Sequence, residues 1–453
     1  MLLVSCMMLL GLLYSLCKDI KLHLHLPDQN GSDYTWHLDQ SFVLVGVIIH
    51  VFSLCSSSMV EEEQYTWHFL TSTLYFVFLR ATSQAIVLVL ICGRILRAWH
   101  QGGVNWSHLP DISKGLESAG TFGIKSLQTV SLILVLYFTS SAFRKVQSRT
   151  ILARVVMVSL FVSGFLILVH IMEDTTMIFN CSATSIAQAV YATLGITVIL
   201  TSVASPWIIP IHNQKNNQII KHKPDFVSSK KKESSLLMGI RDSAYLIGVT
   251  HTVCWCLLQL LLQQPTNSVP ILLLLVQIMA SAIYFSDDKS HHAQWIEVAA
   301  MYFLGMAGHF GLGNSNSLAT VDVAGAFIGI SSHSTVLSGI LMFFITCASP
   351  LLFLLGMIDN ADLGLLLQMI IGFSSLVPLV LNSIVLSAFT IILLLMRNHL
   401  FVWSVFSPKY LYVCAASISV YIGVFSVVAA VVYTCLVIFY RTQKICPNTS
   451  SLK

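Results

Sequence analysis

The sequence predicts an all-α protein, a polytopic transmembrane helical bundle of about 12 helices. Of the 453 residues, 56% are hydrophobic and only 10% are charged, whereas a soluble domain has about 25% charged residues. Apolar stretches of about 20 residues, long enough to cross a bilayer as helices, recur along nearly the whole chain. They lack the alternation typical of a membrane β-barrel. Helices are therefore expected, because their backbone hydrogen bonds are satisfied within each span.

Short loops separate the apolar stretches, so we expect residues 1–453 to form a single integral membrane domain with no soluble catalytic domain. The first stretch has the length of a signal-peptide core but lacks a basic start and a clear cleavage site, so we interpret it as a retained helix. The expected spans lie near 1–17, 41–58, 69–97, 126–143, 151–172, 183–210, 241–263, 268–286, 293–312, 334–358, 364–396 and 410–440.

Basic side chains gather in two places between spans. One cluster lies at 144–154, and the other lies in an expected basic loop at 211–240. Loops rich in Lys and Arg face the cytosol, so we place both clusters there. In a membrane protein such a loop is far more often a topology signal or a contact with anionic lipid than a nucleic-acid site. We therefore expect no nucleic-acid partner.

Three N-x-S/T sequences, at Asn30, Asn105 and Asn180, are candidate glycosylation sites, and such sites are modified only on the lumenal side. All three face the lumen if the N-terminus is cytosolic and the spans are counted as above, which predicts a glycoprotein. The span at 69–97 is unusually long and contains Arg80. If the number of spans is miscounted, we expect the error to lie in this segment.

Few ionisable side chains lie inside the spans, where each charge costs at least about 2.5–3.5 kcal/mol. Arg80, Glu297 and His309 are the main candidates, and pairing or snorkelling favours a structural role for them over a functional one. The eleven cysteines show no zinc-ligand spacing, and we interpret the acidic residues 61–63 as an exposed loop. We find no hydrolytic or phosphoryl-transfer motif, so we expect neither a catalytic residue nor a metal site in this chain.

The span at 293–312 ends in two notable features. Gly305, Gly308 and Gly311 recur every three residues, which predicts close helix packing on that face. The polar run 311–322 cannot face hydrocarbon, so its backbone is either buried in protein or lines a wet cavity. Its Asn and Ser side chains suit a sugar or phosphate headgroup, and a solvated turn is an equally open interpretation.

Four strings, in order along the chain, carry a resemblance to a known family. They are 57–63 with Thr66-Trp67 following, 96–111, 313–322 and 399–409. Together they resemble the C-terminal membrane region of the GPI ethanolamine phosphate transferases, in the branch that modifies the second mannose, and 325–333 is similar to plant members. The resemblance implies an endoplasmic-reticulum membrane protein of GPI-anchor biosynthesis, in which ethanolamine phosphate passes from phosphatidylethanolamine to a mannose hydroxyl of the GPI precursor.

The resemblance also implies a further domain and a partner. Family members carry an N-terminal lumenal domain similar to alkaline phosphatase, with a Thr nucleophile and Asp/His ligands around zinc. No part of this chain corresponds to it, so we carry over no catalytic residue, and zinc is implied only for that domain. A small polytopic stabilising membrane protein is the implied partner. A chain that follows a lumenal domain would start in the lumen, opposite to the orientation above, and a missed or surplus span would reconcile the two.

We therefore predict that the chain is the membrane portion of such a transferase and that it holds and orients the lipid substrates. The alternatives are a non-enzymatic assembly or stabilising subunit and, below it, a transporter, which the ionisable residues in the spans suggest. The residues that we expect to contact substrate headgroups are Asn314, Ser315, Asn316, Thr320, Asp322, Trp403 and Lys409.

Overall fold

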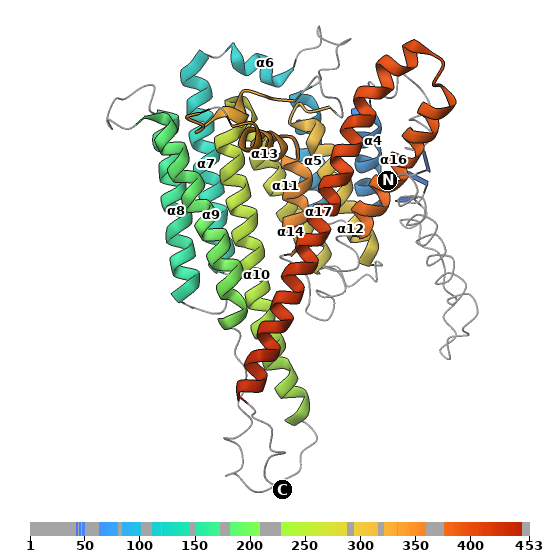
Figure 1. Ribbon diagram of the computed structural model, residues 1–453. Helices are drawn as coiled ribbons and strands as arrows, with labels where there is room; N and C mark the ends of the chain where they lie inside the picture. Colours follow the sequence, from blue (N-terminus) through green and yellow to red (C-terminus); the bar gives the residue numbers. More distant parts are fainter. Residues whose placement is uncertain are drawn as a thin grey trace, which may run out of the picture.

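The computed structural model is a bundle of long helices (Figure 1). Every regular element in the described residues is a helix, which confirms the all-α prediction. The expected spans at 1–17 and, for the most part, 41–58 lie outside these residues, so the total of about 12 helices stays a prediction. The structure describes residues 42–43, 45–46, 48–49, 63–79, 84–100, 111–118, 120–144, 151–172, 182–208, 228–287, 294–315, 321–332, 334–358 and 376–445.

Six of the described helices are long and apolar enough to cross a membrane: α7, α8, α9, α11 and parts of α10 and α17. The chain is therefore a multi-pass membrane protein. The α-helices are α4 (Glu63–Phe78), α5 (Gln84–Trp99), α6 (Ile112–Glu117), α7 (Gly120–Arg144), α8 (Ile151–Met172), α9 (Ala183–Ile208), α10 (Ser228–Leu262), α11 (Ser268–Asp287), α12 (Gln294–Gly311), α13 (Thr335–Thr346), α14 (Ala348–Ile358), α16 (Leu376–Leu395) and α17 (Leu400–Ile445), and the short 3-10 helices are η4 (Pro265–Asn267) and η6 (Gly325–Phe327).

The expected span at 69–97 is wrong, because this part of the chain forms two helices, α4 and α5. The guanidinium of Arg97, near the end of α5, lies 5.7 Å from the ring of Tyr65, near the start of α4. The two helices are therefore antiparallel and form a hairpin. A straight helix over these residues would be about 44 Å long, which exceeds the bilayer core of about 30 Å. Arg80 lies outside the described residues.

The α4–α5 hairpin brings the start of α4 and the end of α5 to the same end of the bundle. Figure 1 shows α6 and the α16–α17 turn at this end, and the start of α10 and the end of α17 at the other. Both basic clusters belong to the opposite end, so we call the first the lumenal end, following the positive-inside rule. Asn30, Asn105 and Asn180 lie outside the described residues.

The expected span at 334–358 is also not a single helix. It divides into α13 and α14, which are bent by 68° at Cys347. Pro350 explains the break, because a proline has no N–H for the carbonyl four residues earlier, and its ring collides with that carbonyl. The freed carbonyl is that of Thr346, the last residue of α13.

Close packing at the glycine face of α12 is confirmed. A Cβ at Gly305 would lie 3.3 Å from the Pro350 Cα, and one at Gly308 would collide with Ser349 of α14 and Leu274 of α11. The main apolar core runs through α4, α5 and α7–α12 together with α14. Helices α16 and α17 contribute a separate apolar cluster, formed by Phe389, Ile392, Leu393, Phe406 and Val413.

Helix α10 begins at Ser228, inside the segment that we expected to be a basic loop at 211–240. The second half of that segment is helical because Lys, Glu, Leu and Met are good helix formers. At 35 and 46 residues, α10 and α17 are about 52 and 69 Å long. Both exceed the bilayer, and their ends project together at the cytosolic end (Figure 1).

Candidate functional site

Polar side chains inside the bundle fall into two groups near its lumenal end. The first, which we call the polar string, connects five side chains by hydrogen bonds: Gln259 to Gln263 (3.3 Å), Gln263 to Asn267 (3.2 Å), Asn267 to His100 (2.8 Å) and His100 to Ser113 (3.3 Å). It runs from the membrane interior, where α10 ends, through η4 to the start of α6. The string therefore links buried backbone to the lumenal surface.

The polar string gives His100 a defined protonation state. The Asn267 Oδ1 can only accept, so the imidazole Nε2–H donates to it. Burial is the largest influence on the pKa of His100 and lowers it, while the hydrogen bond to Asn267 and the carboxylates of Asp111 and Glu117 raise it less. The imidazole is therefore neutral at neutral pH, and the Ser113 hydroxyl donates to Nδ1.

The buried end of the polar string stabilises the break between α13 and α14. An unsatisfied carbonyl in hydrocarbon costs several kcal/mol, and the amides of Gln259 and Gln263 donate to the Phe344 and Ile345 carbonyls at 3.1 and 2.9 Å. The His309 Nδ1 donates to the Thr346 carbonyl, freed by Pro350, at 2.9 Å. The intramembrane His309 that the sequence singled out thus satisfies a carbonyl at the helix break.

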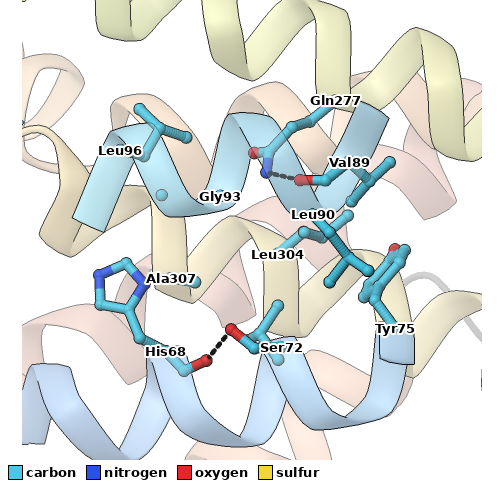
Figure 2. Close-up of a pocket in the computed structure, with 12 residues that line it drawn as sticks. His68, Ser72, Tyr75, Val89, Leu90, Gly93, Leu96, Gln277, Leu304 and Ala307 are labelled. Atoms are coloured by element: carbon cyan, nitrogen blue, oxygen red, sulfur yellow. Dashed lines mark hydrogen bonds between the residues drawn. The ribbon is translucent and has the colours of Figure 1, made fainter. Parts of the chain in front are cut away.

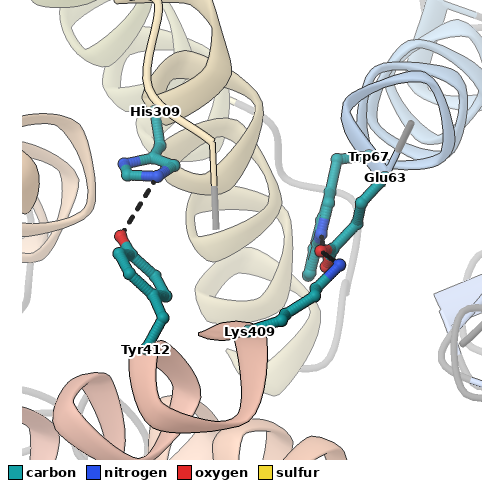
Figure 3. Close-up of polar contacts among 5 residues, drawn as sticks. All are labelled: Glu63, Trp67, His309, Lys409 and Tyr412. Atoms are coloured by element: carbon teal, nitrogen blue, oxygen red, sulfur yellow. Dashed lines mark hydrogen bonds and ion pairs between the residues drawn. The ribbon is translucent and has the colours of Figure 1, made fainter. Parts of the chain in front are cut away.

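The second group is an ion pair between Glu63 of α4 and Lys409 of α17 (Figure 3). The side chains are only 5% and 4% exposed, and the Trp67 indole N–H donates to the Glu63 carboxylate at 2.9 Å. Glu63 is the first residue of α4, where the helix dipole stabilises a negative charge. Apolar replacement of both partners of a buried pair is often neutral, whereas removal of one costs about 3–5 kcal/mol. Stability alone therefore does not account for this pair.

Two neutral hydrogen bonds accompany the ion pair. The Tyr412 hydroxyl of α17 donates to the His309 Nε2 of α12 at 3.3 Å, as Figure 3 shows. The Asn382 amide of α16 donates to the Tyr302 hydroxyl of α12 at 3.2 Å. These contacts and the ion pair join the α16–α17 hairpin to α4 and α12.

A small cavity lies between α4, α5, α11 and α12 (Figure 2). Its volume is about 20 Å³, and its polar lining residues are His68, Thr71, Ser72, Tyr75 and Gln277. Such a space holds about one water molecule. It cannot hold a sugar or a lipid headgroup, so this cavity is not a substrate site.

The predicted headgroup residue Asn314 is buried at the lumenal end. It follows Gly313, whose φ of +84° is readily adopted only by glycine and whose Cα packs against the His100 ring. The Asn314 Nδ2 is buried and has no hydrogen-bond partner among the residues that the structure describes. Asn314 therefore lies beside the polar string with a donor available.

The other predicted site residues do not form one cluster. Asp322 accepts a hydrogen bond from the Ala324 N–H at 3.0 Å, which stabilises a turn. Trp403 is 43% exposed and donates to the Arg397 carbonyl at the turn before α17. Ser315 and Glu297 are half-buried. Asn316 and Thr320 lie outside the described residues.

The expectation that residues 61–63 form an exposed loop is wrong for Glu63, which is buried in α4. Three acidic residues in a row predict side chains exposed to solvent. Glu63 is buried instead because it pairs with Lys409, which is far along the chain. The sequence analysis also missed the polar string. Its signal was present, because Gln259, Gln263 and Asn267 recur every four residues, a spacing that indicates one helix face, although α10 ends at Leu262 and Asn267 lies in η4. The described residues hold no group of three or more His, Cys, Asp or Glu side chains that suits a metal ion.

A family model described as the GPI ethanolamine phosphate transferase membrane region matches residues 7–437. The chain belongs to this family. Among the relatives, GPI ethanolamine phosphate transferase 2, catalytic subunit, of Homo sapiens is 25% identical over 453 residues, which cover 83% of this chain and 42% of the relative. GPI ethanolamine phosphate transferase 2 of Schizosaccharomyces pombe is also 25% identical, over 82% of this chain and 39% of the relative.

The same protein of Yarrowia lipolytica is 21% identical over 82% of this chain and 46% of the relative. The chain thus spans less than half the length of these relatives. No solved structure matches it.

Proposed function

We propose that this chain is the membrane portion of a GPI ethanolamine phosphate transferase of the endoplasmic reticulum that acts on the second mannose. In this proposal it holds the GPI precursor and phosphatidylethanolamine and orients their headgroups at the lumenal end. The names of the relatives, each a transferase 2, support the second-mannose assignment. Two anchored lipids that react must be brought together, and holding both in one orientation removes much of the entropic cost.

The observation that carries the proposal is the buried Asn314 amide, whose Nδ2 has no acceptor. A buried donor without a partner costs about 1–3 kcal/mol, so a ligand oxygen that accepts from it recovers free energy. Sugar hydroxyls and phosphate oxygens are such acceptors. The neutral imidazole of His100 and the hydroxyl of Ser315 lie in the same region and suit the same ligands.

The chemistry of transfer comes from elsewhere in this proposal. We place zinc in a lumenal catalytic domain, and the described residues of this chain hold no group of three or more His, Cys, Asp or Glu side chains that suits a metal ion. A small polytopic membrane protein is the proposed stabilising partner. Purified by itself, the chain should not transfer ethanolamine phosphate to a mannose-bearing acceptor, and turnover free of contaminating enzyme would contradict this division.

Photo-cross-linking in lipid nanodiscs tests the proposal. GPI-precursor analogues with a photoreactive group on the second mannose should label the lumenal segments 311–315 and 321–332, as mapped by mass spectrometry. Asn314→Leu should reduce this labelling about tenfold, which corresponds to about 1.4 kcal/mol. Ser419→Ala, at an exposed site on α17, is the control and should not change it.

Labelling spread evenly over the lipid-facing surfaces of α8 and α17 would contradict the proposal. It would favour the alternative of a non-enzymatic assembly subunit.

A further inference from the structure

The α16–α17 hairpin is attached to the rest of the bundle in an unusual way. Its buried apolar side chains pack mainly on one another. Large apolar side chains elsewhere on the hairpin, such as Leu394, Leu411 and Phe425, are exposed and face lipid. Lipid tails are as apolar as leucine, so apolar contact gives little net attraction between helices in a membrane. Polar contacts therefore determine where the hairpin lies.

These polar contacts differ between the two ends of α17. At the cytosolic end, the Arg441 guanidinium donates to the Pro206 carbonyl of α9 at 2.8 Å, and the Trp207 indole donates to the Tyr433 hydroxyl at 3.3 Å. Near the lumenal end, the attachment to α4 and α12 is the Glu63–Lys409 pair with its two neutral hydrogen bonds. Among the contacts of the described residues, the lumenal attachment contains a pair of opposite charges.

The ion pair lies at the depth of lipid headgroups. Glu63 is the first residue of α4, at the lumenal end. Lys409 lies one helical turn before Tyr412, which contacts His309 in the last turn of α12. Lys409 is thus level with the point where α12 leaves the membrane. A headgroup that entered sideways from the lumenal leaflet would meet these two charges at its own depth.

The surroundings of the pair limit what can replace either partner. The Trp67 ring packs edge-on against Tyr302 and Phe303, with centroids 6.1 and 5.6 Å away. The Lys409 ammonium lies 5.6 Å from the Phe389 ring centroid. In such a setting a charge stays ionised only if an opposite charge or an aromatic face accompanies it. A simple anion would pair with Lys409 and leave Glu63 unpaired, and a simple cation would do the reverse.

We propose that the Glu63–Lys409 pair is an exchangeable latch that binds a lipid headgroup carrying both an amine and a phosphate. The amine pairs with Glu63 beside the Trp67 ring, and the phosphate pairs with Lys409. Both charges stay paired throughout, so the hairpin moves aside without leaving a buried charge alone. This proposal rests on the proposed function, a membrane region that handles lipids, and it names the site and the class of headgroup.

Lipid competition tests the latch. The chain is delipidated in detergent and offered equal amounts of phosphatidylethanolamine and phosphatidylglycerol with identical acyl chains, and native mass spectrometry measures the lipid retained. The headgroup of the first has an amine and a phosphate, whereas that of the second has a phosphate only. We expect about a tenfold preference for phosphatidylethanolamine. The double variant Glu63→Gln/Lys409→Met, which is neutral and of similar size, should reduce the preference to about one.

A matched control uses a second ion pair at the same end of the bundle, between Asp111 and the exposed Lys114. The double variant Asp111→Asn/Lys114→Met should keep the preference. The charge-exchanged variant Glu63→Lys/Lys409→Glu retains both charges and should also keep it, which separates lipid recognition from loss of folding. Water-soluble phosphoethanolamine should not displace the lipid, because the latch is reached from within the bilayer; efficient displacement would overturn the lipid as occupant.

Equal retention of the two lipids by the wild-type chain would overturn the latch, whether or not the variants fold. The proposed function would survive that result if Asn314-dependent labelling by the GPI-precursor analogue persisted. If that labelling were lost and the phosphatidylethanolamine preference remained, the headgroup site at Asn314 would be contradicted and the lipid site at the Glu63–Lys409 pair would stand.

Discussion

The main bundle and the α16–α17 hairpin represent two ways of holding helices together in a membrane. In the bundle, glycines on α12 let α11 and α14 approach until no side chain fits between the backbones. In the hairpin, a small apolar cluster is sufficient within the pair, and attachment to α4 and α12 depends on polar contacts. Close packing gives a rigid scaffold, whereas a polar attachment can exchange partners. The difference identifies the hairpin as the part of the chain suited to move.

The largest expected effect tests the polar attachment. Lys409→Met leaves the Glu63 carboxylate buried without its cation, which should destabilise the attached hairpin by about 3–5 kcal/mol. Adding Glu63→Gln removes the second charge and should restore most of this loss. Hydrogen exchange of α16 and α17 in nanodiscs, together with thermal unfolding, measures both. Additive losses in the double variant would show that the two charges do not interact and would remove the contrast between the two regions.

Close packing in the bundle predicts the next largest effect. Gly308→Val places a branched side chain where Ser349 and Leu274 already lie, and such overpacking typically costs about 1–3 kcal/mol. The melting temperature in detergent should fall accordingly. Gly423→Ala on α17 is the matched control, since no atom lies within 4 Å of its Cβ position. An equal response at the two positions would contradict the distinction between packed bundle and lipid-facing hairpin.

The sequence predicted the bundle better than the attachment for a physical reason. The unbroken apolar run at 151–172 is helix α8 with the same bounds, and the glycines of α12 pack as their spacing indicates, because both signals are local. The break at Pro350 was also local and was missed. The burial of Glu63 has no local signal in the sequence, since it depends on Lys409 in a distant helix.

The candidate site shows the same division. For the polar run 311–322, burial in protein, a wet cavity and a solvated turn were all left open, and the structure buries Asn314. Which neighbours surround it depends on how α5, η4 and α12 meet, and no local pattern specifies that. Trp403 is exposed, and an exposed tryptophan is also typical of the aromatic belts at membrane surfaces.

A third prediction concerns the polar part of the bundle itself. The Asn267 amide donates to the Leu312 carbonyl at 3.1 Å and accepts from His100. Asn267→Leu removes these two bonds and the bond to Gln263, at a cost of about 1–2 kcal/mol for each group left without a partner. Hydrogen exchange should rise in 100–118 and 308–315 and stay unchanged in α8. A rise confined to α8 or to the hairpin would show that the polar string does not stabilise the lumenal end.

The smallest expected effect is a pH dependence from His100. Burial lowers its pKa in the folded chain below the ordinary value of 6.5, so below about pH 6.5 the unfolded chain binds more protons than the folded one. Stability must then decrease as pH falls from about 6.5 towards the lowered pKa, and it should be independent of this group at higher pH. Nearby Asp111 and Glu117 reduce the effect, and Lys114 increases it.

Thermal unfolding of the wild type and of His100→Gln between pH 7.5 and 5.5 measures this contribution. The variant keeps an amide that can bond to Asn267 but binds no proton, so its melting temperature should fall less on acidification. His399→Gln, at an exposed position in the α16–α17 turn, is the control and should leave the pH dependence of the wild type unchanged. If His100→Gln keeps the change of melting temperature with pH and His399→Gln abolishes it, the proton-linked group lies in the α16–α17 hairpin and not in the packed bundle. The contrast between the rigid scaffold and the exchangeable attachment would then include the pH dependence of stability.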